Sequence, residues 1–176
     1  SRSAFKLIEL NKKFKFIKKN TKLLDVGAYP GGWAQVSSKI ITVGKILSLD
    51  IKKMEQLKNV SFLHSNFLEN ETKEKIFKFF GKKLNVVLSD MAADTTGNKS
   101  LDCIRTNQLC ADVINFSSQI LKSDGVLISK LFMGEDFLEV KELAKSKFKK
   151  VQFFKPEASR NESKETYIYC TSLKAL

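Results

Sequence analysis

Short runs rich in β-forming residues alternate with longer helical patterns along the whole sequence. Strand-like runs are expected at 22–26, 45–50, 60–63, 84–89, 125–131, 151–154 and 165–170. Helical patterns fill the intervals, at 4–18, 32–41, 72–80, 101–121 and 135–148. This alternation predicts an α/β domain in which crossover helices join parallel strands.

Two of the strand-like runs are apolar on successive residues. They are the segments Leu84-Asn85-Val86-Val87-Leu88 and Val126-Leu127-Ile128. Uninterrupted apolar residues indicate strands that helices cover on both faces. The pattern therefore predicts a doubly wound sheet, whose ligands bind at the carboxyl ends of the strands.

Composition supports one folded domain and leaves two explanations open for its positive charge. The 176 residues are 43% hydrophobic, enough to bury a core without disulfides or metal. The net charge is +12, and seven basic residues against one acidic residue crowd into positions 1–20. Such polarity is compatible with nucleic acid binding or with a solvated lysine-rich face.

The positions of cysteine, histidine and apolar residues restrict the class of protein and its cellular compartment further. Cys103, Cys110 and Cys170 lack CxxC spacing, and His64 is the single histidine, so we expect no metal site and reduced thiols in an intracellular protein. No apolar run approaches the roughly 18 to 20 residues of a membrane span. The sequence begins at Ser1 without methionine, so we expect it to be trimmed, and a targeting segment is not visible in it.

A glycine-rich turn follows the first predicted strand, in the segment LLDVGAYPGGW at 23–33. Its glycines let the backbone approach a ligand, and a helix start near Gly32 offers free N–H groups. The turn lacks the lysine of a P-loop, and the second strand ends in Asp50, which can accept hydrogen bonds from ribose hydroxyls. NAD and S-adenosylmethionine both satisfy this pattern, and the GxxxGG spacing favours S-adenosylmethionine, which has no pyrophosphate.

Five segments in series resemble the FtsJ/RrmJ family of S-adenosylmethionine-dependent RNA ribose 2′-O-methyltransferases. They are SRSAFKL at 1–7, LLDVGAYPGGWAQV at 23–36, LSDMA at 88–92, ISKLFMGED at 128–136 and KPEASRNESKETYIY at 155–169. The resemblance covers essentially the whole chain. It implies a Rossmann-like class I methyltransferase: one domain over 1–176, a seven-stranded, mostly parallel sheet with an antiparallel last strand, and helices on both faces.

The resemblance also implies a catalytic Lys-Asp-Lys-Glu site made of Lys6, Asp90, Lys130 and Glu165. Lys130 is the predicted base that takes the proton of the ribose 2′-hydroxyl. An amine accepts a proton only when it is neutral; burial and Lys6 lower the pKa of Lys130, whereas the two carboxylates raise it. That balance stays open at this stage. Alternatively, the carboxylates orient Lys130 while Lys6 holds the substrate phosphate or ribose.

For the cofactor, the resemblance implies binding residues in the glycine-rich turn and at the ends of the second, third and fourth predicted strands. The predicted residues are Gly27, Tyr29, Pro30, Gly31, Gly32, Trp33, Asp50, Ile51, Asn66, Phe67 and Asp90. Two positions depart from the family pattern. Asn66 stands where aspartate often receives the adenine amino group, and its side-chain carbonyl can still accept from that group. Tyr29 replaces a small residue and either stacks on the ligand or covers the pocket. We expect no catalytic role for the neighbouring His64.

RNA contacts are predicted for a basic rim that consists of Arg2, Lys6, Lys12, Lys13 and Arg160. Phosphate contacts of this kind position RNA without reading its sequence. A basic helix at about 3–18 would supply most of them, while Phe14, Phe16 and Ile17 of that segment are expected in the core.

The resemblance favours ribosomal RNA as the substrate, at a uridine of the large subunit, with ribosomal RNA or the large subunit as the partner. Two alternatives stay open: a tRNA anticodon-loop 2′-O-methyltransferase, and a catalytically silent rRNA-binding assembly factor. The second alternative predicts the loss of a catalytic residue, and none of the four is lost. No membrane contact is predicted, and a monomer is the expectation.

Overall fold

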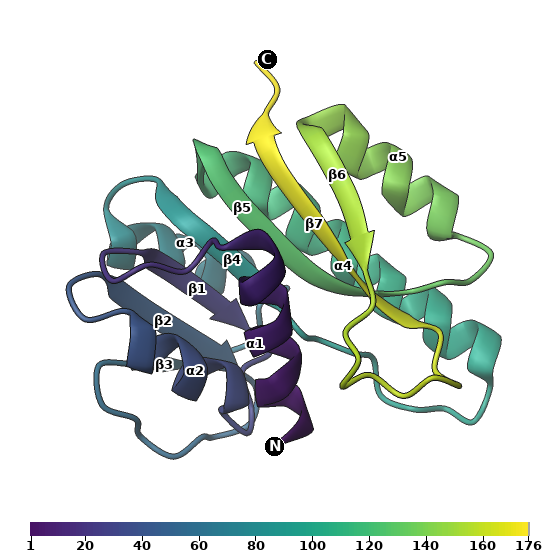
Figure 1. Cartoon of the computed structure of the whole chain (residues 1–176), viewed down its shortest axis with the longest axis horizontal. Coiled ribbons are helices and arrows are strands. Elements are labelled where there is room, and N and C mark those ends of the chain that lie inside the picture. Colours follow the sequence, from purple (N-terminus) through teal and green to yellow (C-terminus); the bar gives the residue numbers. More distant parts are fainter. Residues whose placement is uncertain (176) are drawn as a thin grey trace.

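A seven-stranded sheet forms the middle layer of the computed structural model, which describes residues 1–175 (Figure 1). The elements are α1 (Arg2–Phe14), β1 (Lys22–Val26), α2 (Gly32–Ile40), β2 (Lys45–Asp50), β3 (Ser61–His64), α3 (Asn70–Phe80), β4 (Leu84–Ser89), α4 (Lys99–Ile120), β5 (Leu121–Phe132), α5 (Phe137–Lys147), β6 (Phe148–Phe154) and β7 (Glu165–Leu173). The strand order is β3-β2-β1-β4-β5-β7-β6. Strands β1 to β5 pair in parallel, whereas β7 pairs antiparallel with both β5 and β6. The predicted fold class is confirmed.

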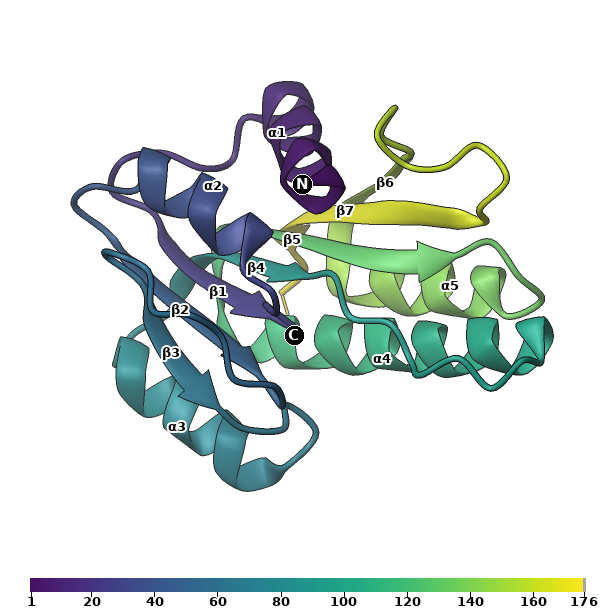
Figure 2. The same ribbon diagram turned by 90° about the horizontal axis from the view of Figure 1, so that it is seen from below.

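Helices cover both faces of the sheet, with α1 and α2 on one face and α3, α4 and α5 on the other (Figure 2). Each face has its own apolar core. On the first face Leu7 and Leu10 of α1 pack with Trp33 of α2 and with Tyr167 of β7. On the second face α3, α4 and α5 pack on a larger core. Both layers bury central strand residues, which explains the successive apolar residues Val86–Leu88 in β4 and Val126–Ile128 in β5.

The first helix is shorter than its apolar pattern predicts, because it ends at Phe14 and not at 18. Lys15 adopts a left-handed backbone with a φ of 52°, and its N–H donates to the carbonyl of Asn11. The Asn11 side chain then accepts the backbone N–H groups of Phe16 and Ile17. Phe16 and Ile17 are buried, as expected, but they reach the core from the irregular segment that follows the helix.

Other predicted boundaries differ by a few residues. Strand β5 begins at Leu121, four residues before its predicted start, because Leu121 already pairs with Leu84 of β4. Strand β6 begins at Phe148 because this residue pairs with Leu173 of β7. Helix α4 begins two residues early, where the side chain of Asn98 accepts the N–H of Leu101 as an N-cap.

The pairing register brings the candidate site residues to one edge of the sheet. Ser89, which precedes Asp90, pairs with Val26 of β1 and with Ser129 of β5. Glu165 pairs with Phe132 at the end of β5, two residues after Lys130. Three of the predicted catalytic residues therefore leave neighbouring strands at the same end. No helix within residues 1–175 is long and apolar enough to cross a membrane.

Candidate active site

Lys6, Asp90, Lys130 and Glu165 form one chain of ion pairs at this edge. The amine of Lys130 lies 3.2 Å from Asp90 Oδ1 and 3.2 Å from Glu165 Oε1. The Lys6 amine, contributed by α1, lies 2.8 Å from Glu165 Oε2. The four side chains are only 9% to 18% exposed, so water screens these charges poorly. The structure thus brings together all four residues that the sequence predicted.

Hydroxyl groups fix both carboxylates of the cluster. Tyr167 donates to Asp90 Oδ1 at 2.6 Å, and Ser3 donates to Asp90 Oδ2 at 3.3 Å. Buried Ser159 donates to Glu165 Oε2 at 2.7 Å. Tyr167 is itself fully buried and packs against the ring of Trp33. Each carboxylate is therefore oriented before a substrate arrives.

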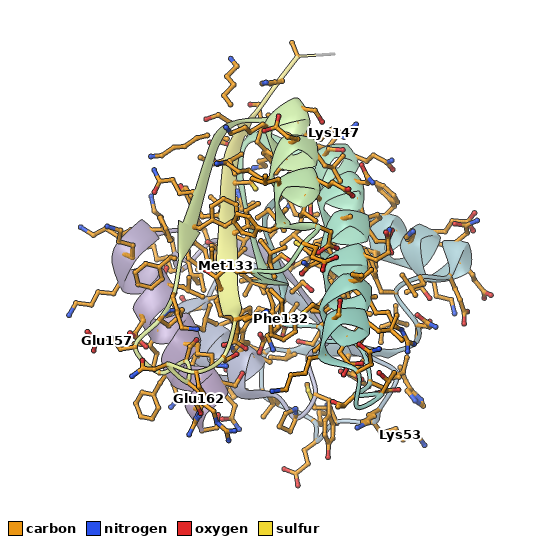
Figure 3. All side chains as sticks on the ribbon, turned by 90° about the vertical axis from the view of Figure 1, so that its right-hand side faces the viewer. Lys53, Phe132, Met133, Lys147, Glu157 and Glu162 are labelled. Atoms are coloured by element: carbon orange, nitrogen blue, oxygen red, sulfur yellow. The ribbon has the colours of Figure 1, made fainter. Side chains whose placement is uncertain are left out.

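The carboxylate of Glu9, in α1, holds the loop between β6 and β7, residues 155–164. Both oxygens of Glu9 accept backbone N–H groups, from Glu157 at 2.7 Å and from Ala158 at 2.9 Å. Ser159 follows directly, and Figure 3 shows Glu157 and Glu162 of this loop beside α1. The loop that carries Ser159 and the helix that carries Lys6 are therefore held together.

Charge and burial shift the pKa values of the site in opposite directions. Burial lowers the pKa of Lys130, but Asp90 and Glu165 outweigh it and raise that pKa above its ordinary value. Burial raises the pKa of Glu165, but Lys130, Lys6 and Ser159 together lower it below its ordinary value. Burial raises the pKa of Tyr167, and Asp90 adds to the effect, so its hydroxyl keeps its proton. Without ligands, the site therefore holds an ammonium group between two carboxylates.

A cavity of about 680 Å³ opens next to Asp90, and we call it the cofactor cavity. Its size is that of a typical small-molecule site. Seven of the predicted cofactor residues line it: Gly27, Tyr29, Asp50, Ile51, Asn66, Phe67 and Asp90. The cavity follows the carboxyl ends of the strands, where a doubly wound sheet binds its ligands.

The wall of the cofactor cavity has the features that a nucleoside requires. Asp50 accepts the N–H groups of Tyr29 at 2.9 Å and Lys52 at 2.8 Å, which directs its carboxylate into the mouth and leaves lone pairs for ribose hydroxyls. Gly27 has a φ of +70°, and a Cβ there would lie 2.4 Å from Cγ of Met91. The turn can thus lie against Met91 only as glycine. These observations fit S-adenosylmethionine.

Four predicted cofactor residues, Pro30, Gly31, Gly32 and Trp33, do not line this cavity. Gly31 lies against Met54, and a Cβ on Gly32 would lie 3.0 Å from Oγ of Ser1. Trp33 is 2% exposed and donates its ring N–H to the carbonyl of Ser3 at 2.7 Å. The structure uses Gly32 and Trp33 to seat α1 against α2, and their contacts with the ligand stay predictions.

Asn66 lines the cavity, but its side-chain oxygen already accepts the N–H of Leu68 at 3.0 Å. An adenine amino group would share this oxygen through its second lone pair. His64 donates its Nε2–H to the Ile51 carbonyl, 2.8 Å away, and so ties the end of β3 to the segment after β2. Tyr29 lies at the mouth with the Lys52 amine over its ring.

The cofactor cavity also has a wall that the sequence did not predict. Met91, Asp94, Arg105, Gln108 and Asp112 line it, from the segment after β4 and from α4. All five lie outside the glycine-rich turn, and tertiary packing brings them to the cavity. Arg105, Gln108 and Asp112 are spaced by three and four residues along α4, and this spacing is the one signal that would have grouped them.

A buried carboxyl lies below the turn. Burial, with a smaller contribution from Asp90, raises the pKa of Asp25 to about 8, although a hydrogen bond from Ser48 opposes the shift. Asp25 is therefore largely protonated near neutral pH and adds no full negative charge beside Asp90.

The predicted RNA contacts lie on two parts of the surface. Arg2 and Arg160 line an open cavity of about 560 Å³ between α1 and residues 157–162, which we call the loop cavity. Lys12 and Lys13 are exposed in the last turn of α1. Lys6 differs from them, because its amine is engaged by Glu165. Among residues 1–175 no group of acidic, histidine or cysteine side chains could hold a metal ion.

Comparisons with known proteins agree with this geometry. The sequence model of the family described as FtsJ-like methyltransferase matches residues 1–173. A Pelagibacter ubique (strain HTCC1062) protein named ribosomal RNA large subunit methyltransferase E is 43% identical over 174 residues, covering 99% of this chain and 86% of that protein. A Rickettsia akari (strain Hartford) protein of the same name is 42% identical over 180 residues, covering 99% and 79%.

Solved structures agree as well. A Plasmodium falciparum protein described as a ribosomal RNA methyltransferase superposes with a TM-score of 0.85 at 31% identity, covering 98% of this chain and 97% of the other. Human methyltransferase-like protein 13, in complex with SAH, shares the fold with a TM-score of 0.65 at 16% identity, covering 95% and 78%. The chain belongs to the FtsJ-like methyltransferase family, and it is a methyltransferase that uses S-adenosylmethionine as its methyl donor.

Proposed function

We propose that this enzyme methylates ribosomal RNA of the large subunit, at a ribose 2′-hydroxyl of a uridine. The observation that carries the proposal is the Lys6–Glu165–Lys130–Asp90 cluster beside the cofactor cavity. The names of the Pelagibacter and Rickettsia relatives support ribosomal RNA as the substrate class. The basic N-terminal segment supports a polyanionic partner.

The cluster supports Lys130 as the base. An ammonium group has three N–H donors, and two of them are directed at Asp90 and Glu165. When Lys130 loses the third proton, its lone pair takes that third direction, away from both carboxylates. A ribose 2′-hydroxyl in this direction can donate its hydrogen bond to the amine and then its proton.

The other residues position the reaction. Bound S-adenosylmethionine supplies a methyl group on a positively charged sulfur. Asp90 borders both Lys130 and the cofactor cavity, so it places the amine at the edge where the methyl group must arrive. Lys6 and Ser159 hold Glu165, which in turn holds Lys130. Alignment of this kind contributes much of the rate acceleration in group transfer.

Transfer of radiolabelled methyl groups tests the proposal. The three substrates are undermethylated large ribosomal subunits, free ribosomal RNA and total tRNA. We expect label on the subunit or its RNA, and its loss in Lys130→Ala while S-adenosylmethionine still binds. Lys145→Ala, an exposed lysine of α5, is the matched control and should keep full activity. Label on tRNA alone would contradict the proposal, as would full activity in Lys130→Ala.

A further inference from the structure

A further cavity of about 630 Å³ lies beside the active site, and we call it the α4 cavity. The first half of α4, the segment after Asp90, the end of β5 and residues 162–164 line it. Ala92 and Ala93 line both this cavity and the cofactor cavity, so they form a shared wall. Glu162 lines both this cavity and the loop cavity.

The α4 cavity adjoins the catalytic cluster along the chain at three points. Ala92 follows Asp90 by two residues, and Phe132 follows Lys130 by two. Lys164 directly precedes Glu165, and Phe132 pairs with Glu165 across the sheet. In Figure 3 Glu162 lies toward the end of the molecule opposite Lys147, and Phe132 lies between them. A group held in this cavity would therefore lie next to the segments that carry Asp90, Lys130 and Glu165, although these three side chains do not line the cavity.

The lining of the α4 cavity fits a flat, neutral group better than a phosphate. Its apolar part includes Ala92, Ile104 and the ring of Phe132. The charged side chains of the lining are two lysines and three carboxylates, namely Lys99, Lys164, Asp102, Glu135 and Glu162. Such a balance does not attract a phosphate, whereas an aromatic ring with surrounding polar groups is how proteins hold an unstacked base.

We propose that the α4 cavity binds the base of the nucleotide that is methylated. This inference rests on the proposed function and adds the place of the base to it. The base leaves the ribose at C1′, next to the carbon that carries the 2′-hydroxyl. When the hydroxyl meets Lys130, the base must therefore lie within one sugar ring of the cluster. The cofactor cavity is reserved for the methyl donor, and the loop cavity contains Arg2 and Arg160, which suit phosphates.

Filling the cavity is the first test. Ile104→Trp introduces an indole on α4 at a position that lines the α4 cavity alone. Leu138→Trp is the matched control, because Leu138 is exposed on α5 and lines none of the three cavities. We expect Ile104→Trp to lower kcat/KM for undermethylated large subunits at least tenfold, with S-adenosylmethionine affinity within twofold of the parent. Leu138→Trp should change neither quantity.

A native thiol offers a second test that needs no new side chain. Cys103 lines the α4 cavity, whereas Cys110 and Cys170 are buried. Burial raises the pKa of both buried thiols, that of Cys110 to about 12, so N-ethylmaleimide should react at Cys103. We expect the modified enzyme to lose methyl transfer while it still binds S-adenosylmethionine. Undermethylated subunits should slow both the labelling and the loss of methyl transfer.

The outcomes separate this inference from the function on which it rests. If the unmodified enzyme transfers methyl groups and both Ile104→Trp and the labelled enzyme do so at the parent rate, the base lies elsewhere and only the cavity assignment is overturned. If the unmodified enzyme transfers no methyl group to ribosomal RNA, the proposed function fails and the cavity assignment fails with it.

Discussion

To act as a base, Lys130 must first lose a proton that Asp90 and Glu165 stabilise on its amine. Asp90 and Glu165 raise the pKa of its amine, so only a small fraction is neutral near pH 7. If Lys130 is the base, the rate of methyl transfer should rise with pH over the neutral range. Lys130→Arg keeps the positive charge but cannot lose it, so we expect at least a roughly 100-fold lower kcat with S-adenosylmethionine affinity preserved.

The measurement is single-turnover methyl transfer between pH 6 and 9, with calorimetric titration of S-adenosylmethionine alongside. Activity in Lys130→Arg close to the parent value would show that the charge alone matters. Lys130 would then orient the substrate without taking its proton.

Glu165 makes stability depend on pH. Burial opposes ionisation, but Lys130, Lys6 and Ser159 hold the pKa of Glu165 below its ordinary value of 4.5. Its folded pKa is depressed, so its stabilising contribution is full above about pH 4.5 and is lost as the pH falls through the folded pKa. We expect Glu165→Gln to lose roughly 1–3 kcal/mol of unfolding free energy at pH 7.

Urea unfolding of both proteins between pH 3 and 7 checks this expectation. The difference in unfolding free energy between parent and Glu165→Gln should narrow as the pH falls through the folded pKa of Glu165, where the parent carboxylate takes up a proton. A gap that stays constant over the whole range would contradict an electrostatic origin.

At the scale of residues, the sequence predicted the four residues of the ion-pair cluster but not the groups that orient them. Lys6, Asp90, Lys130 and Glu165 lie in recognisable segments, and the structure joins them within ion-pair distance. The hydroxyl of Ser3 reaches Asp90 across 87 positions of sequence, which no local pattern encodes. Trp33 shows the opposite case, since its motif position suggested the ligand while its ring is buried against Tyr167.

At the scale of elements, the turn after β1 can take its observed path only because Gly27 has no Cβ. Gly27 combines a φ of +70° with a prospective Cβ only 2.4 Å from Met91 Cγ, whereas Gly81 has a φ of +66° and open space around it. Gly27→Ala therefore adds a clash to the backbone strain, and Gly81→Ala adds strain of about 1 kcal/mol alone. We expect Gly27→Ala to weaken S-adenosylmethionine binding at least tenfold.

Calorimetric titration of the two variants separates the clash from the strain. Gly81→Ala should bind S-adenosylmethionine like the parent. Parental affinity in Gly27→Ala would mean that Met91 moves aside without cost to the cavity.

Helix α1 and the loop before β7 should behave as one unit, because Glu9 fastens them. Its carboxylate accepts two successive backbone N–H groups, and hydrogen bonds to a charged group contribute about 1.5–3 kcal/mol each. We expect Glu9→Ala to speed hydrogen exchange in residues 155–164 and to lower methyl transfer, since Ser159 and Lys6 lose their common support. Exchange measured by mass spectrometry tests this, with exposed Glu142→Ala as the control. Parental exchange in that loop would show that other contacts hold it.

The predicted ends of helices and strands match the structure only where the local sequence pattern and the tertiary contacts end an element at the same residue. Strand β1 matches its predicted range, because its apolar run ends at the glycine-rich turn. Helix α1 stops early because Asn11 binds the chain that follows, a side-chain contact that hydrophobic periodicity does not register. The early start of β5 at Leu121 is set by its partner strand.

At the scale of the whole molecule, the two faces of the sheet differ in what their helices contribute to the site and to the charged surface. Helix α1 brings Lys6 to the site and exposes Lys12 and Lys13 in its last turn, while α3 lies on the opposite face (Figure 2). The positive charge of the first 20 residues thus lies on the face that supplies Lys6 to the ion-pair cluster. A large polyanion that approaches this face meets α1 and the loop cavity together.

If α1 contacts RNA phosphates, the charge of its last turn should set the salt dependence of binding. Lys12→Glu with Lys13→Glu should weaken binding to undermethylated large subunits and reduce the slope of log affinity against log salt by about 1–2 units, since each phosphate contact contributes about 0.7–0.9. Lys78→Glu with Lys82→Glu makes the same charge change at exposed positions near the end of α3, on the other face. Filter binding at four salt concentrations compares the two pairs. Equal effects would mean that net charge alone attracts the RNA, whereas a lower slope only in the α1 pair places the phosphates along that helix.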